Sequence, residues 1–152
     1  MSRLCFLLVP FVGAIISVYG QGGFTPINTD QFALAVSDFE LPWADAVAAC
    51  TARGQSLLSV DSAGKDRVLV DLFVNGGANM TLPGNNSWIG ATESREGAWI
   101  WQSSNEPLYY TRWMVGQPDD ISSINCAYQA VQALLYWRDA NCSAPMYFIC
   151  ES

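Results

Sequence analysis

The sequence predicts an α+β domain, and three observations lead to this fold class. Two segments of the first half carry apolar residues at helical spacing, the second half holds short apolar strands, and one long stretch between those strands has no period. Of the 152 residues, 51% are hydrophobic and 12% are aromatic, which is enough for the core of one domain. No internal repeat or low-complexity tract divides the chain.

The first twenty residues have the layout of a secretory signal peptide. Arg3 precedes the apolar run Leu4–Val18, and Val18 and Gly20 are small enough to flank a cleavage site. A membrane anchor is the alternative, but proline and glycine interrupt a stretch that is barely long enough to span a bilayer. The expected boundaries are a signal peptide at 1–20, a short N-terminal lead at 21–31 and the domain at 32–152.

The first predicted helix comes after a short strand at residues 32–36. Pro42 opens the helix, and Gly54 is its natural stop. Its apolar face consists of residues at i, i+3, i+4 and i+7, namely Trp43, Ala46, Val47 and Cys50.

A second helix comes after a short apolar strand at Ser56–Val60. Asp61 or Ser62 caps its start, the helix extends to about Val74, and Asn75-Gly76-Gly77 ends it. One side of this helix is apolar and consists of Leu69, Leu72 and Phe73.

Short strands dominate the rest of the chain. They begin with Trp88–Gly90 and Trp99–Trp101, and the second of these places both indoles on one face. Residues 102–125 form a long loop without a period, and a loop of this length in a compact domain is usually functional. Closing strands are predicted at 126–132, 134–137 and 146–151.

The charge and the histidine content exclude several classes of function. Seven Lys and Arg residues against fourteen Asp and Glu give a net charge of −7, so the chain cannot build the basic face that nucleic acids and anionic membranes require. The sequence has no histidine, which excludes Ser-His-Asp and Cys-His catalysis and every histidine-ligated metal site.

Signal cleavage removes Cys5 and leaves an even number of cysteines, Cys50, Cys126, Cys142 and Cys150. An even count in a secreted chain predicts two disulfides, and the spacing alone leaves three connectivities open. A zinc site is disfavoured, because the chain has no Cys-x-x-Cys pair and no histidine. With no odd cysteine, a disulfide-linked dimer is not expected.

Two glycosylation sites are predicted in a Gly/Asn/Pro-rich stretch. Asn79-Met80-Thr81 and Asn85-Asn86-Ser87 match the acceptor pattern, and such a stretch is expected to lie at the surface. Asn141 also matches, but we expect no glycan there because the middle residue, Cys142, is expected to be bridged.

The chain resembles the C-type lectin-like domain family from about residue 32 to residue 151. The matching pieces, in the family's order and spacing, are Trp43-Ala44-Asp45-Ala46 before Cys50, Trp88-Ile89-Gly90-Ala91, Gly97-Ala98-Trp99-Ile100-Trp101, Trp113-Met114-Val115-Gly116-Gln117-Pro118-Asp119, Trp137-Arg138-Asp139 before Cys142, and Phe148-Ile149-Cys150-Glu151. The resemblance implies a C-type lectin-like fold: two helices, short antiparallel sheets and a long ligand-binding loop. It also implies the disulfides Cys50–Cys150 and Cys126–Cys142.

The resemblance places a ligand site in the long loop. Family members that bind sugar do so through calcium, and Gln117-Pro118-Asp119 matches the triplet associated with galactose-type sugars, with a cis proline between the ligands. Asp139 matches the carboxylate that closes the calcium shell. The implied carbohydrate-binding residues are therefore Gln117, Asp119 and Asp139, and the implied metal ligands are Gln117, Asp119, Asp120 and Asp139.

Two positions depart from the calcium pattern of the family. Ile124 stands where the family has a glutamate, and Arg138 stands where it has an asparagine. The site loses two oxygen ligands and gains a positive charge, which opposes calcium binding. We therefore hypothesise that Arg138 replaces calcium as the internal cation of the loop, where it would pair with Asp119, Asp120 or Asp139.

Other residues of the predicted loop region are weaker candidates. Glu93 and Glu96 lie near the family's auxiliary calcium site, although a solvated turn is the preferred interpretation. Tyr109 and Tyr110 can stack on a sugar, whereas Trp113 is assigned to the core. An alternative is that Asp119 and Asp139 are the acid and base of a glycosidase, but the family does not support it.

The resulting expectation is a secreted, extracellular lectin without enzymatic activity. Its partners would be glycans of the galactose type, in innate defence or cell recognition. The alternative is a calcium-independent lectin-like domain that binds a cell-surface or secreted protein or another non-sugar ligand. Neither nucleic-acid binding nor membrane insertion after signal cleavage is expected.

Overall fold

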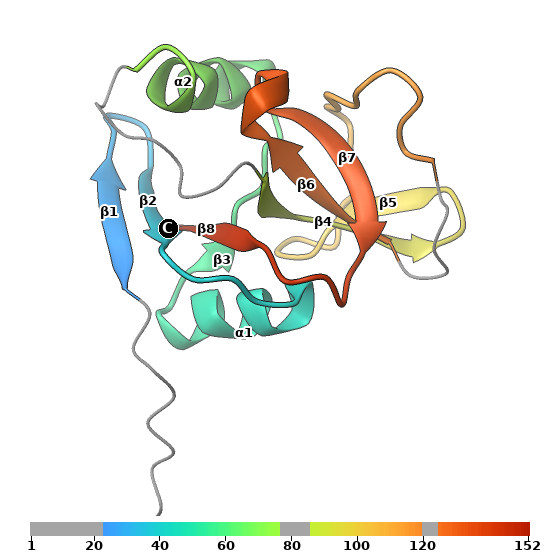
Figure 1. The fold of residues 1–152 in the computed structure, drawn as a ribbon, viewed down its shortest axis with the longest axis horizontal. Helices are drawn as coiled ribbons and strands as arrows, with labels where there is room; N and C mark the ends of the chain where they lie inside the picture. The colour runs from blue at the N-terminus through green and yellow to red at the C-terminus, as the bar shows by residue number, and fades with distance from the viewer. Residues whose placement is uncertain (1–22, 77–85, 120–124) are drawn as a thin grey trace, which may run out of the picture.

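The computed structural model describes residues 23–76, 86–119 and 125–152, which form an α+β domain with two helices and one mixed sheet. Figure 1 shows α1 and α2 on opposite sides of the sheet, with the segment 102–119 extending beyond β5 and β7. In chain order the elements are β1 (Phe24–Asn28), β2 (Ala33–Ser37), α1 (Trp43–Ala52), β3 (Ser56–Leu57), α2 (Ala63–Phe73), β4 (Asn86–Arg95), β5 (Ala98–Trp101), β6 (Asn125–Ala130), the 3₁₀ turn η1 (Val131–Ala133), β7 (Tyr136–Asn141) and β8 (Tyr147–Glu151).

The sheet connects both ends of the described chain. Its strand order is β1-β2-β8-β4-β6-β7, with β3 beside β8 and β5 beside β4. The pairs are antiparallel except β4–β8, which is parallel, so the expectation of wholly antiparallel sheets is corrected at this pair. The segment predicted as a short lead contains β1, which pairs with β2 along its whole length.

Both helices lie where the apolar spacing predicted them. On α1, Trp43, Ala46 and Cys50 are buried, and the Trp43 indole donates to the Ile89 carbonyl at 2.8 Å. On α2, Ser62 is the cap that the sequence left open against Asp61, because its hydroxyl accepts from a main-chain N–H of the first turn. The strand predicted at residues 56–60 is shorter and comprises β3 alone.

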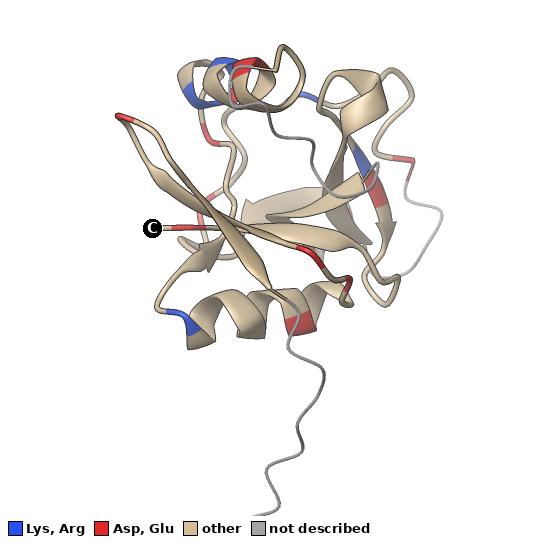
Figure 2. Ribbon diagram, turned by 60° about the vertical axis from the view of Figure 1, so that its left-hand side comes forward, with Lys and Arg blue, Asp and Glu red and all other residues tan. Residues whose placement is uncertain are grey.

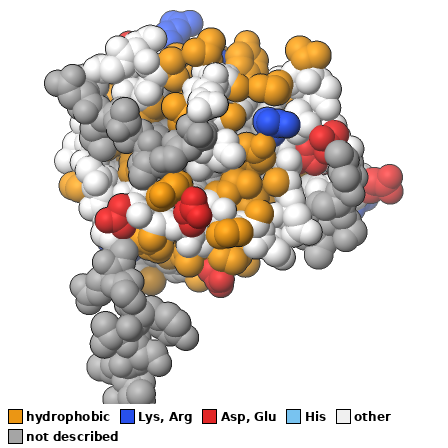
Figure 3. All heavy atoms as spheres, viewed as in Figure 1, with side chains coloured by type: hydrophobic (Ala, Val, Ile, Leu, Met, Phe, Trp, Pro, Cys, Tyr) orange, Lys and Arg blue, Asp and Glu red, His pale blue; other side chains and the backbone are white. Residues whose placement is uncertain are grey.

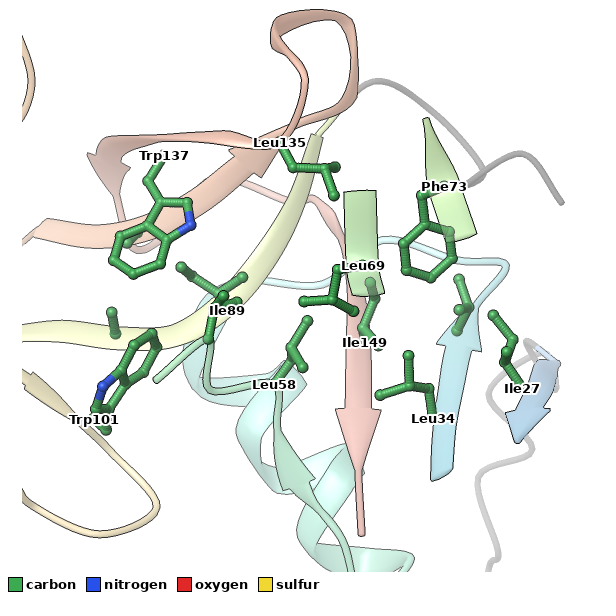
Figure 4. Packing of buried hydrophobic residues seen from close by; sticks show 14 of the residues in the cluster. Ile27, Leu34, Leu58, Leu69, Phe73, Ile89, Trp101, Leu135, Trp137 and Ile149 are labelled. Carbon is green, nitrogen blue, oxygen red and sulfur yellow. The ribbon is translucent and has the colours of Figure 1, made fainter. Parts of the chain in front are cut away.

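One hydrophobic cluster lies between α2 and the sheet and is rich in tryptophan, and a second cluster packs around the buried face of α1. Figure 4 shows Leu69 and Phe73 of α2 facing Ile89 of β4, Ile149 of β8 and Leu58, which directly follows β3. Trp101 and Trp137 pack edge to face with ring centres 5.5 Å apart, and both are buried. Trp113 packs in the same way against Trp99 and Trp137, so its assignment to core packing is correct.

Two disulfides bind the ends of the fold together, and their pairing is the one that the resemblance implied. Cys50–Cys150 joins α1 to β8 across 100 residues, and Cys126–Cys142 joins β6 to the turn after β7 across 16 residues. Cys50, Cys126 and Cys150 are buried. Neither of the two described helices is long and apolar enough to cross a membrane.

Candidate functional site

The long loop lies along the open edge of β7. The Trp137 N–H donates to the Arg112 carbonyl at 2.8 Å, and the Met114 N–H donates to the Trp137 carbonyl at 2.9 Å. Trp113 and Trp137 form a parallel bridge between the two segments. These backbone bonds fix the middle of the loop against β7, so the residues after Met114 lie near Asp139.

Gln117, Asp119 and Asp139 meet there in a closed set of hydrogen bonds. The Gln117 amide Nε2 donates to Asp119 Oδ2 at 2.8 Å. The Asp119 main-chain N–H donates to Asp139 Oδ1 at 2.9 Å, and the Asp139 main-chain N–H donates to Gln117 Oε1 at 3.0 Å. The Gln117–Pro118 peptide bond is cis, as the resemblance implied. We call this arrangement the Gln117 triad; it brings together three of the four predicted ligand residues.

The Gln117 triad has a buried base and an exposed rim. Asp139 is 9% exposed, Gln117 is half-buried and Asp119 is exposed. Each of its three bonds joins one side-chain group to the backbone or side chain of the next residue, so the carboxylates are oriented before any ligand arrives. Carboxylate oxygens accept hydrogen bonds and the amide both donates and accepts, which is the chemistry needed to hold alcohol groups.

Arg138 does not take the role that the sequence suggested. It lies on β7 opposite Tyr128, and β7 alternates buried and exposed side chains from Trp137 to Asp139. Arg138 therefore points away from the face that carries Asp139, and within the described residues no ion pair joins it to a carboxylate. The hypothesis that Arg138 is the internal cation of the loop is not supported for Asp119 and Asp139, because strand alternation directs it elsewhere.

Tyr128, the cross-strand partner of Arg138, is within reach of the charges of both this arginine and the two triad carboxylates. Burial raises the pKa of Tyr128 above its ordinary value of 10.0, Arg138 lowers this pKa, and the Asp139 and Asp119 carboxylates raise it. Burial is the largest of these effects, because the phenolate loses hydration on the buried face.

The described residues do not complete a calcium site. Calcium takes six to eight oxygens, whereas the Gln117 triad brings two carboxylates and one amide that already bond one another. Across residues 23–76, 86–119 and 125–152, no group of three or more His, Cys, Asp or Glu side chains is placed to hold a metal ion. Two residues that bear on the calcium prediction, Asp120 and Ile124, lie outside the described residues.

Glu93, the candidate for an auxiliary calcium site, has a structural role instead. Its Oε2 accepts from the Asn125 amide at 3.2 Å, and its other oxygen accepts from the Gly97 N–H in the turn between β4 and β5. Glu93 thus ties this turn to the start of β6, which supports the preferred interpretation of an ordinary turn. The predicted glycosylation sites, Asn79 and Asn85, and the predicted signal peptide lie outside the described residues.

Sequence reasoning missed a second polar cluster, between α2 and the loop. Asp66 is only 7% exposed, and its carboxylate forms an ion pair with Arg112. Arg112 in turn lies over the Tyr136 ring, 4.6 Å from its centre. The signal was present in the sequence, because Asp66 precedes Leu69 and Phe73 by three and seven residues and so lies on the apolar face of α2.

Comparisons with known proteins agree with this geometry. Residues 40–152 match the family model described as the Lectin C-type domain. The chain is 31% identical over 112 residues to human C-type mannose receptor 2, a match covering 73% of this chain but 7% of that receptor. It is 30% identical over 114 residues to the galactose-specific lectin nattectin of Thalassophryne nattereri, covering 72% of this chain and 67% of that protein.

A solved structure extends the likeness to three dimensions. A calcium-independent type II antifreeze protein matches with a TM-score of 0.68 and 25% sequence identity, covering 86% of this chain and 91% of the other. The chain spans only a small part of the mannose receptors that it matches, so their whole-protein activities do not carry over. The family match over residues 40–152, the two disulfides and the loop against β7 together show that this chain belongs to the C-type lectin domain family.

Proposed function

We propose that this protein is a secreted lectin whose Gln117 triad binds galactose-type glycans. The observation that carries the proposal is the convergence of Gln117, Asp119 and Asp139 at the end of β7, with their polar groups oriented by one another. An amide and two carboxylates in a fixed arrangement match the alternating donors and acceptors of neighbouring sugar hydroxyls. Because the orientation precedes binding, little entropy is lost when the sugar arrives.

The residues of the triad act by hydrogen bonding alone in this mechanism. A carboxylate has about four lone-pair sites, so Asp119 and Asp139 can each accept from a sugar hydroxyl while keeping their bonds within the triad. The Gln117 amide offers a donor as well as an acceptor to the adjacent hydroxyl. The exposed position of Asp119 leaves access from solvent.

The preference for galactose-type sugars rests on the order of the two ligand side chains. Gln117 and Asp119 place an amide before a carboxylate, and the mannose-type triplet of the family places a carboxylate before an amide. Exchanging the amide and the carboxylate reverses which of the two sugar hydroxyls lies beside a hydrogen-bond donor. A relative that is itself named as galactose-specific, nattectin, supports the same preference.

A glycan array, probed in calcium and again in chelator, tests the proposal. The unmodified protein should bind galactose-terminated glycans, and the double variant Gln117→Glu, Asp119→Asn should move the preference toward mannose. Arg138→Gln is the matched control, because this side chain points away from the triad. Mannose selectivity in the unmodified protein would overturn the assignment. Glycan binding by a triple variant that combines Asp139→Ala with Gln117→Glu and Asp119→Asn would overturn it as well.

Secretion is supported by the cysteine chemistry and by the N-terminal sequence. Disulfides persist in oxidising compartments, and this domain has two of them. The apolar run after Arg3 supplies the targeting segment, and Asn79 and Asn85 would then receive glycans in transit. Expression in insect or mammalian cells should release protein that starts near Gln21 and loses mass on treatment with an N-glycosidase. Retention of the apolar run in released protein would contradict the proposal.

A calcium-independent ligand that is not a sugar is the second candidate. The incomplete oxygen set at the triad favours it, as does the likeness to a protein described as calcium-independent. Figure 3 shows hydrophobic side chains gathered across the centre of one face with few charged groups among them, which suits a protein partner. An empty glycan array together with capture of a protein from extracellular fluid, lost on substitution within this face, would favour the second candidate over the first.

A further inference from the structure

A pocket of about 660 Å³ lies between α2, the long loop and the start of β7, next to the segments that carry the Gln117 triad but lined by other residues. Its walls include Asp66 and Arg67 of α2, Tyr110 and Arg112 of the loop, and Tyr136 of β7. None of these residues belongs to the triad. The pocket is a shallow, open hollow, and exposed Arg67 and Tyr136 stand at its rim, so a ligand there would stay partly in contact with solvent.

The floor of the pocket is a charged pair that is almost buried. Arg112 Nη1 donates to Asp66 Oδ2, and the two side chains are 18% and 11% exposed. Burial raises the pKa of Tyr110, and the negative charge of the nearby Asp66 carboxylate raises it further. Asp66 is thus neutralised within the wall and adds little repulsion toward an arriving anion.

Both arginines of the pocket have N–H donors left for a ligand. A guanidinium has five N–H donors, and within the described residues Arg112 uses one nitrogen on Asp66 while its flat face covers the Tyr136 ring. Arg67 has no carboxylate partner in the described parts of the chain and stands at the rim. Figure 2 shows both basic and acidic positions on α2, which carries Lys65 and Arg67 together with Asp66 and Asp71. Two guanidinium groups against one satisfied carboxylate make this pocket locally positive.

We propose that this pocket binds a sugar residue carrying one anionic group, a carboxylate or a sulfate. Arg112 and Arg67 hold the anion, since a guanidinium matches the geometry of such oxyanions. Tyr136 is 40% exposed, and the accessible part of its ring packs against the sugar ring. The Thr111 hydroxyl hydrogen-bonds the sugar. A polyanion is disfavoured, because the acidic surface beyond the pocket repels its further charges.

Titration calorimetry with defined monosaccharides tests this site in the whole mature protein. Glucuronic acid represents the carboxylate class, galactose 6-sulfate the sulfate class, glucose the neutral sugar, and heparin the polyanion. One or both of the singly charged sugars should bind more tightly than glucose and heparin, and binding should weaken as salt rises. Equal binding of glucose, or tighter binding of heparin, would overturn the proposal.

Arg67→Gln is the informative variant, because this exposed side chain has no ion-pair partner among the described residues whose loss would unfold the protein. It should weaken binding of the preferred acidic sugar by about tenfold. Arg95→Gln is the matched control, an exposed arginine at the turn between β4 and β5 that makes the same change in net charge. Equal losses in the two variants would attribute the effect to overall charge and defeat the assignment.

The Gln117 triad provides an independent check. Gln117→Glu with Asp119→Asn should leave binding of the acidic sugar unchanged, while Arg67→Gln should leave binding of galactose-type glycans unchanged. If the protein binds the acidic sugar but no galactose-type glycan, the proposed function is refuted and the proposal for the α2 pocket still holds. Loss of acidic-sugar binding in the triad variant would show that the anion binds at the triad, and the α2 pocket would be ruled out.

Discussion

The main-chain N–H of Asp119 donates to the Asp139 carboxylate at 2.9 Å, across twenty residues of sequence. This bond ties the long loop to the end of β7. It also places two acidic residues side by side, with the main-chain N–H of one directed at the carboxylate of the other. The loop is thereby positioned by the protein itself, and stability measurements on variants can test that arrangement.

Asp139→Ala should destabilise the fold more than Asp139→Asn. The asparagine keeps an oxygen that can accept from Asp119, whereas alanine leaves that N–H without its acceptor. We expect a cost of about 1.5–3 kcal/mol for alanine and less than about 1 kcal/mol for asparagine in the free energy of unfolding. Urea titrations followed by tryptophan fluorescence measure both values. Equal losses of unfolding free energy in the two variants would mean that the hydrogen bond from Asp119 to Asp139 does not stabilise the fold.

Chelator should leave the melting temperature unchanged. The described residues supply too few oxygens for calcium, and a ligand that does not bind the folded state cannot stabilise it. Thermal unfolding in millimolar calcium and in excess chelator should agree within about 1 °C. A melting temperature that rises with calcium concentration would restore an ordinary calcium-dependent site at the loop.

The Asp66–Arg112 pair should behave as one unit. Removing either charge leaves the other buried without its partner, so Asp66→Asn and Arg112→Gln should each cost about 3–5 kcal/mol. The double variant should cost less than the sum of the two, which a double-mutant cycle in urea measures. Additive costs would indicate that the pair is not coupled in solution.

Alkaline pH should weaken the fold through two tyrosines. Burial raises the pKa of Tyr110 and of Tyr128 above the ordinary 10.0, so the folded state holds both protons more tightly than the unfolded state does. Their contribution is complete below about pH 10 and is lost as the pH rises through the folded-state values.

Phenylalanine variants isolate this effect. Tyr128→Phe and Tyr110→Phe should each flatten the fall of the unfolding free energy as the pH rises above about 10. Tyr109→Phe is the control, because this ring is 85% exposed. If the control variant flattened the profile as much as the others, burial would not be the cause.

The two disulfides should differ in their contribution to stability. The Cys50–Cys150 bridge spans 100 residues and the Cys126–Cys142 bridge spans 16. In the chain-entropy model, replacing the first pair by alanines costs about 4–5 kcal/mol and replacing the second costs about 3 kcal/mol. Unfolding of the two double variants in urea gives the comparison. A larger loss from the shorter bridge would mean that local packing outweighs loop entropy.

The two helices were predictable from the sequence for local reasons, and the disulfide pairing from the family resemblance. Trp43, Ala46 and Cys50 recur at helical spacing, and Ser62 stands directly before the first residue of α2, where a hydroxyl can cap the helix. The strand β1 was missed because its identity depends on a tertiary contact. Its residues, with Pro26 in the middle, resemble a polar lead until β2 pairs with them.

The sequence identified the residues of the candidate site but not all of their contacts. The triplet around Pro118 and the position of Asp139 came from a family pattern. Strand alternation already puts Arg138 on the face opposite Asp139, whereas its family position suggested that it reaches the loop, and in the structure the alternation holds. Asp66 was recognisable as a charge on an apolar face, but its partner Arg112 lies 46 residues away and belongs to a loop without a period.

The antiparallel pairing of β2 with β8 has a practical consequence for attaching this domain to a surface. Leu34 lies opposite Glu151, and the Ser152 N–H donates to the Ala33 carbonyl at 3.1 Å, so the C-terminal residue is held at the β2 edge. Figure 1 shows the C-terminus and segment 102–119 toward opposite ends of the domain. A chip linker, fluorophore or fused multimerising module joined after Ser152 would therefore orient the Gln117 triad outward, toward whatever passes in solution.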